Sequence, residues 1–247
     1  MPDYVNITYA YYGISMTRTL RLLSGGAAHG LVEALMPSFE AETGYVIEGT
    51  FSAVGAMRDR LVAGEPADLV ILSRALVEAL TQDGYVDGES ARDLGTVATA
   101  IAVRTSDPIP ALDDAEALRR ALLAAGAVHF PDPAQATAGI HFARVLEKLG
   151  LKDHLADRLQ PAPNGATAMR ALAASRAQQP LGCTQATEIL VTPGIVLAAP
   201  LPHGCDLSTV YTAAIATKAA APREAAALIA MLASPSAASL RQRLGFT

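Results

Sequence analysis

The sequence of 247 residues predicts an α/β protein of two lobes, in which parallel sheets are flanked by helices and two strands cross between the lobes. Short apolar runs alternate with helical patterns through the first 100 residues, as in a doubly wound parallel sheet. Two longer apolar segments, residues 97–103 and 209–217, are spaced to carry the chain into a second lobe and back. We therefore expect a ligand site beyond the carboxyl ends of the strands, between the lobes.

The first unit, residues 20–35 (LRLLSGGAAHGLVEAL), sets the pattern for the others. An apolar strand at residues 20–23 leads through two glycines, which let the backbone turn sharply, into a helix with an apolar face. The first N–H groups of a helix have no partner within it, so such a turn can bind an anion. The segment lacks the GxGxxG, GKS and GKT patterns of nucleotide sites, and an ordinary strand-to-helix turn remains an alternative.

The other elements follow in the same order. In the first lobe we expect strands at residues 45–51 and 67–72 and helices at 56–63 and 74–82. In the second lobe we expect helices at 114–125, 136–149 and 166–176, strands at 127–130 and 181–184, and a short segment near Leu159. The last two helices are expected at 223–233 and 236–244.

These elements predict a discontinuous domain organisation. The expected parts are an extension at residues 1–15, a first lobe of residues 16–97 plus 212–247, and a second lobe of residues 98–211. The lobes should close on a ligand by a hinge in the two crossing strands.

Composition excludes several classes of function. The net charge of −5 provides no basic face for nucleic acid, and aromatic residues make up only 5% of the chain, so stacking platforms for bases are not expected. Cys183 and Cys205 have no CxxC spacing, so we expect no metal site and no cofactor; a disulfide and two free thiols both remain open. No apolar run reaches the roughly 18–20 residues of a membrane span.

The first 15 residues, MPDYVNITYAYYGIS, do not read as a secretory signal peptide, because they carry Asp3 and have neither a basic start nor a long apolar run. Met16 is an alternative start. The sequence as given therefore predicts a cytoplasmic protein, or a periplasmic one if a leader has been removed.

From about Thr17 to its end, the chain resembles the type II periplasmic solute-binding proteins, most closely the molybdate-binding branch, to which aconitate isomerase is also similar. The blocks that carry this resemblance are SGGAAHGLVEALMPSFEAETG, FSAVGAMRDRLVAGEPADLVILS, FPDPAQATAGIHFARVLEKLGL and ALIAMLASPSAASLRQRLGF. The resemblance implies the two-lobed Venus-flytrap fold and a small anionic ligand between the lobes. It also implies an ABC permease as partner if the protein is exported.

The same resemblance implies the ligand-binding residues, since this family holds oxyanions with hydroxyls and backbone N–H groups at helix starts. Carried over, those positions and their neighbours are Gly26, Ala27, Ala28, Ser52, Ala53, Val54, Thr137, Ala138, Gly139, Ala166, Thr167 and Gln185. Two serine positions of the molybdate branch fall on alanine or valine here, and its tyrosine falls on Gln185. We therefore expect a small organic carboxylate rather than molybdate, with an inorganic oxyanion as the alternative.

An arginine would complement a carboxylate ligand, because its guanidinium fork matches two oxygens. Arg74 is our preferred candidate, since it directly follows the third strand. Arg58 and Arg170 are weaker candidates. For all three the alternative is a solvated surface charge.

Two histidines raise a catalytic hypothesis. His29 lies near the start of the first helix, and His141 follows Gly139 at a comparable place in the second lobe. If both face the cleft, one could remove a proton from an unsaturated acid while the other returns one elsewhere, as in an allylic isomerisation. Glu188 is a weaker acid–base candidate. The alternatives are a histidine that only donates to the anion, a surface histidine, and a ligand-sensing module without catalysis.

Overall fold

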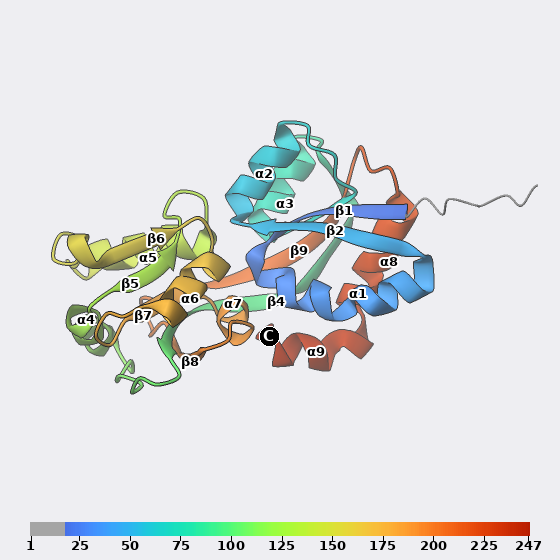
Figure 1. The fold of residues 1–247 in the computed structure, drawn as a ribbon. Coiled ribbons are helices and arrows are strands. Elements are labelled where there is room, and N and C mark those ends of the chain that lie inside the picture. The colour runs from blue at the N-terminus through green and yellow to red at the C-terminus, as the bar shows by residue number, and fades with distance from the viewer. Residues whose placement is uncertain (1–17) are drawn as a thin grey trace, which may run out of the picture.

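The computed structural model describes residues 18–247, so the predicted extension of residues 1–15 lies outside the described range. Figure 1 shows two lobes side by side, connected by two strands that run between them, β4 (Val86–Arg104) and β9 (Ser208–Ala216). The α/β fold with helices on both sides of its sheets is thereby confirmed.

The first lobe is built on three parallel strands. β1 (Arg18–Gly25) lies between β2 (Tyr45–Ser52) and β3 (Leu69–Ser73), and β9 joins β3 in the antiparallel direction. Its helices are α1 (His29–Thr43), α2 (Val54–Val62), α3 (Arg74–Gln82), α8 (Pro222–Ala233) and α9 (Ala238–Arg243), with single 3-10 turns η1 (Gly26–Ala28) and η3 (Pro235–Ala237). The apolar runs predicted as buried strands are buried: Leu20, Leu22, Leu69 and Ile71 are at most 1% exposed.

The second lobe has the same parallel arrangement. β5 (Val128–Pro131) lies between β6 (Leu159–Ala162) and β7 (Leu181–Gln185), while the last part of β4 pairs antiparallel with both β7 and β8 (Ile195–Pro200). Its helices are α4 (Ala115–Ala124), α5 (Thr137–Lys148), α6 (Gly165–Ala174), α7 (Ala186–Leu190) and the 3-10 turn η2 (Ala156–Arg158). A separate apolar core around Phe130 and Phe142 stabilises this lobe.

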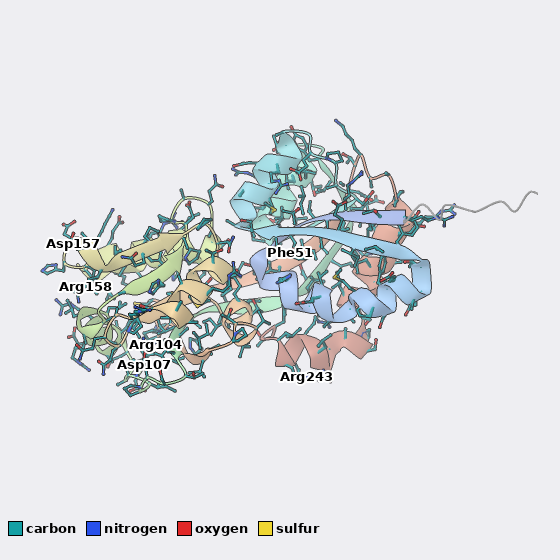
Figure 2. The ribbon with its side chains drawn as sticks, in the orientation of Figure 1. Phe51, Arg104, Asp107, Asp157, Arg158 and Arg243 are labelled. Atoms are coloured by element: carbon teal, nitrogen blue, oxygen red, sulfur yellow. The ribbon has the colours of Figure 1, made fainter. Side chains whose placement is uncertain are left out.

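Polar contacts fix the outer edge of the second lobe. The Arg104 guanidinium, at the end of β4, donates to both carboxylate oxygens of Asp107 at 2.6 and 2.9 Å and to the Ser175 carbonyl beyond α6 (Figure 2). These groups are largely buried, so the arginine ties the end of the crossing strand to the C-terminus of α6.

Three features differ from the sequence-based expectation. β4 begins at Val86, eleven residues before the predicted segment, because Asp87, Arg92 and Asp93 pair with β9 through their backbones. The register shifts between Asp87 and Arg92 and between Asp93 and Gly95. The short helix α7 and the strand β8 were not expected at all.

No helix within residues 18–247 combines the length and the apolar character that crossing a membrane requires.

Candidate functional site

A small cavity lies where the two lobes meet. Its lining residues come from both lobes and from β9: Gly26, Ala27, Ser52, Ala53, Val54, Pro131, Ala136, Thr137, Ala138, Gly165, Thr184, Gln185, Glu188 and Tyr211. The volume is about 20 Å³ in this closed arrangement, which is room for roughly one or two water molecules. The carboxyl ends of β1, β2, β5 and β7 all lead into this region, as expected for an α/β ligand site.

Direct contacts hold the lobes together at the rim of the cavity. The Gly55 N–H at the start of α2 donates to the Gln135 carbonyl of the second lobe at 3.0 Å, and the Gln135 amide donates to Asp59 at 3.4 Å. The Asn164 amide donates to the Ser52 hydroxyl across the same boundary, at 3.4 Å. These three hydrogen bonds show that the structure is a closed form.

Three helix starts contribute to the cavity wall. Within residues 18–247, η1, α2 and α5 begin here without any side-chain cap, because Gly25, Ala53 and Ala136 at their N-cap positions carry no acceptor. By contrast, α4 begins away from the cavity, and Asp114 caps it by accepting from the Ala117 N–H at 2.7 Å. Helix N-termini carry partial positive charge, so the uncapped starts favour an anion at the cavity.

Glu188 places a carboxyl group within this wall. Its side chain is 6% exposed and accepts a hydrogen bond from the Thr184 hydroxyl at 2.6 Å. Burial raises the pKa of Glu188, although hydrogen bonds from Thr184 and from the backbone N–H groups of Gln185 and Ala166 oppose the shift. Glu188 is therefore easier to protonate than an ordinary glutamate.

Tyr211 and Gln185 complete the buried polar side. Tyr211, on β9, is 2% exposed, and burial together with the charge of Glu188 raises its pKa, so the phenol stays neutral. The Gln185 Nε2 donates to the Thr209 hydroxyl at 3.5 Å, whereas its buried Oε1 accepts no hydrogen bond from the described part of the chain. That oxygen is available to a ligand donor.

The expected ligand-binding residues divide into two groups. Those that line the cavity are Gly26, Ala27, Ser52, Ala53, Val54, Thr137, Ala138 and Gln185. Those that lie outside its lining are Ala28, Gly139, Ala166 and Thr167. Sequence reasoning missed Pro131, Gly165, Thr184 and Tyr211, and it gave Glu188 only a minor place. The position of Thr184 at the carboxyl end of a predicted strand was the signal that could have identified it.

Arg74 lies in a different hollow, of about 420 Å³, which is also lined by α3 and the first part of β4. Its guanidinium is half exposed and pairs with Asp93, which also accepts from the Thr212 hydroxyl at 2.6 Å. The partly buried Arg58 pairs with its neighbour Asp59, and Arg170 donates to the Thr167 hydroxyl at 3.0 Å.

The two candidate catalytic histidines also lie outside the cavity lining. The exposed His29 packs against Phe51, with ring centroids 4.4 Å apart; Figure 2 labels Phe51 near the end of β2 that faces the second lobe. The His141 Nε2 donates to the Cys205 carbonyl at 2.7 Å and so packs into the second lobe. Among the described residues, no group of three or more His, Cys, Asp or Glu side chains is placed to hold a metal ion.

Comparison with known proteins agrees with this architecture. Residues 20–247 match the family described as bacterial extracellular solute-binding protein. A Pseudomonas sp protein named aconitate isomerase is 32% identical over 231 residues, which is 89% of this chain and 84% of that protein. The molybdate-binding protein ModA of Escherichia coli (strain K12) is 26% identical over 228 residues, covering 90% of this chain and 87% of ModA.

The solved structures show the same fold. The periplasmic molybdate-binding protein of Azotobacter vinelandii has a TM-score of 0.73 at 20% identity and covers 92% of this chain and 98% of its own. The resemblance to type II periplasmic solute-binding proteins near the molybdate branch is thus confirmed. The chain belongs to the family of bacterial extracellular solute-binding proteins.

Proposed function

We propose that this protein binds a small organic carboxylate in the cavity between its lobes. The observation that carries the proposal is the set of uncapped helix N-termini, from η1, α2 and α5, that both lobes bring to one cavity. Their backbone N–H groups favour an anion. Ala27, Val54 and Pro131 stand beside the hydroxyls of Ser52 and Thr137, which suits a ligand with a carbon skeleton as well as oxygens.

Entry of such a ligand requires movement. The closed cavity has room for about one or two waters, so an organic acid must enter between opened lobes and displace side chains that fill the cavity. The crossing strands β4 and β9 are suited to a hinge, because both run from one lobe into the other. In a transport role the partner would be an ABC permease, provided that the protein is exported.

A thermal-shift screen of molybdate, sulfate, citrate, cis- and trans-aconitate, muconate and aromatic acids tests the proposal. An acid at about 100 times its Kd should stabilise the protein by roughly 2.7 kcal/mol. Ala27→Asp places a negative charge at the first helix start and should abolish this shift, whereas Ala111→Asp, on an exposed loop, should not. Retained affinity in Ala27→Asp, or stabilisation by molybdate alone, would contradict the proposal.

A second candidate is an isomerase of a small unsaturated carboxylic acid. It is favoured by the 32% identity to the protein named aconitate isomerase and by the presence of Glu188 and Tyr211, two ionisable groups, in the cavity. An allylic shift needs one proton removed from carbon and another returned.

Proton NMR of cis- and trans-aconitate with the protein in heavy water distinguishes the two candidates. Isomerisation or deuterium incorporation would establish the enzyme, and unchanged spectra of an acid that binds would establish the receptor. His29→Gln and His141→Gln in the same assay test the histidines expected from the sequence to move the proton.

A further inference from the structure

The two lobes close directly onto the Glu188 carboxyl group. A Cβ atom at Gly26 of the first lobe would collide with Glu188 Oε1, and a Cβ atom at Gly165 of the second lobe would collide with Oε2. The carboxyl therefore sits between two helix starts, one from each lobe, and a side chain at either glycine would have to displace it.

No countercharge accompanies this carboxyl in the cavity. Of the residues that line it, Glu188 and Tyr211 are the ionisable ones, and no Lys, Arg or His of residues 18–247 is among them. A ligand carboxylate that enters would therefore approach a second carboxyl group in a site shielded from water. Two carboxylates in one such site cannot both stay ionised, and they titrate as a pair that holds one proton.

We propose that Glu188 recognises the ligand by sharing one proton with it, so that an organic acid binds with net uptake of a proton from water. In the complex the proton lies on Glu188, whose O–H donates to a carboxylate oxygen of the ligand. This rests on the proposed function, that the cavity binds an organic carboxylate. On this proposal Glu188 determines which anions bind, because a basic carboxylate oxygen accepts a hydrogen bond from this O–H better than an oxygen of a strong-acid anion such as sulfate does.

The surroundings of Glu188 support this assignment. The elements packed against α7 are η1, α1, α6, β4, β7 and β8. The ionisable side chains of these elements near α7 are the exposed His29 and Glu33 on α1, the exposed Arg170 on α6 and the buried Cys183 on β7. Residues 98–103 of β4, residues 195–200 of β8 and the turn η1 carry no ionisable side chain. The remaining neighbour is Tyr211 on β9, which is neutral. Burial raises the pKa of Glu188, in the direction that proton sharing requires.

Calorimetric titration of the protein with trans-aconitate tests the inference. Titrations from pH 5 to 9 in two buffers of different ionisation enthalpy count the protons taken up on binding. Above the pH at which Glu188 ionises in the free protein, wild type should take up close to one proton more per bound acid than Glu188→Gln does. Over the same range, the Kd of wild type should weaken with rising pH by up to tenfold per pH unit more than the Kd of the variant. The titration of the probe itself cancels, because both proteins bind the same acid. Glu33→Gln, on the exposed face of α1, should match wild type.

Each other outcome is decisive. Equal proton uptake by wild type and Glu188→Gln would overturn the inference and leave the proposed function intact. If neither protein binds trans-aconitate or the other acids of the screen at any pH, the proposed function fails, and the inference fails with it.

If only Glu188→Gln loses binding, carbonyl ¹³C NMR of Glu188 in wild type settles the question, with the signal assigned by its absence from the variant. A resonance at the neutral position in the complex, at a pH where the free protein shows the ionised one, supports the inference. A resonance that stays ionised in the complex overturns it.

Discussion

The hydrogen bond between Gly55 and Gln135 offers a direct test of how the lobes are held closed. The Gly55 N–H donates to the Gln135 carbonyl at 3.0 Å, and a Cβ added at Gly55 would lie 2.8 Å from that same oxygen. Gly55→Ala therefore introduces a methyl group closer to a backbone oxygen than real side chains come, and the lobes must move apart to relieve it.

The expected magnitude follows from the lost hydrogen bond alone. A net contribution of about 1 kcal/mol corresponds to a factor of about five in the equilibrium between closed and open lobes, and the steric contact adds to it. The variant should still fold, because alanine is favoured over glycine by up to about 1 kcal/mol in the helix α2 that contains this residue. Since this gain offsets the lost hydrogen bond, the free energy of unfolding should change little while the lobes open.

Single-molecule fluorescence transfer measures the open and closed populations. Cysteines introduced at the exposed Val62 and Ile109 place one label in each lobe, and the native Cys183 and Cys205 are buried and so protected from labelling. A parallel urea titration reports the free energy of unfolding. If Gly55→Ala leaves the populations of the ligand-free protein unchanged, the contact with Gln135 does not hold the lobes together and the reasoning is refuted.

Two further predictions concern stability. The buried Asp68 accepts hydrogen bonds from the backbone N–H groups of Arg21, Ala220 and Ala221 at 2.7–2.9 Å. Asp68→Asn should therefore lower the free energy of unfolding by about 2–3 kcal/mol, measured by urea titration. A loss below about 0.5 kcal/mol would contradict this prediction. Burial lowers the pKa of His129 in the folded state, so the unfolded state binds more protons below about pH 6.5 and stability should fall as the pH drops through that range. His129→Phe should flatten this dependence between pH 7.5 and 5, and a curve parallel to wild type would refute it.

The sequence predicted those elements whose local patterns agree with their surroundings. Apolar runs followed by glycine or small-residue turns placed β1, β2 and β3, and α3 begins and ends at the predicted residues 74 and 82. The first half of β4 could not be predicted, because its charged, exposed residues form a strand only through pairing with β9. For the same reason the ion pair of Arg74 could not be predicted, because its partner Asp93 belongs to this half of β4.

In the candidate site, too, the features set by the local sequence were predicted and those set by strand pairing were not. Helix starts at Ala27, Ala53 and Thr137 are local features, so their approach to one cavity followed from the fold class. The positions of Tyr211 and Gln185 depend on the registers in which β9 pairs with β3 and β7 pairs with β4, where Tyr211 lies opposite Ser73 and Gln185 opposite Thr99. A shift of one residue in either register would turn these side chains to the other face of the sheet, and no local pattern sets the register.

Backbone N–H groups and side chains have different roles in ligand recognition at this cavity. N–H groups at helix starts attract any anion of suitable size, because they respond to charge and hardly to the rest of the ligand. Discrimination therefore has to come from the side chains between them, and the polar ones that are nearly fully buried are Thr184, Gln185, Glu188 and Tyr211. Of these four, Glu188 alone can change its charge in the range where carboxylic acids ionise, since Tyr211 stays neutral. A site that attracts anions through its backbone and donates a shared proton to them would favour anions with a basic oxygen over strong-acid anions such as sulfate, without a cationic side chain in its lining.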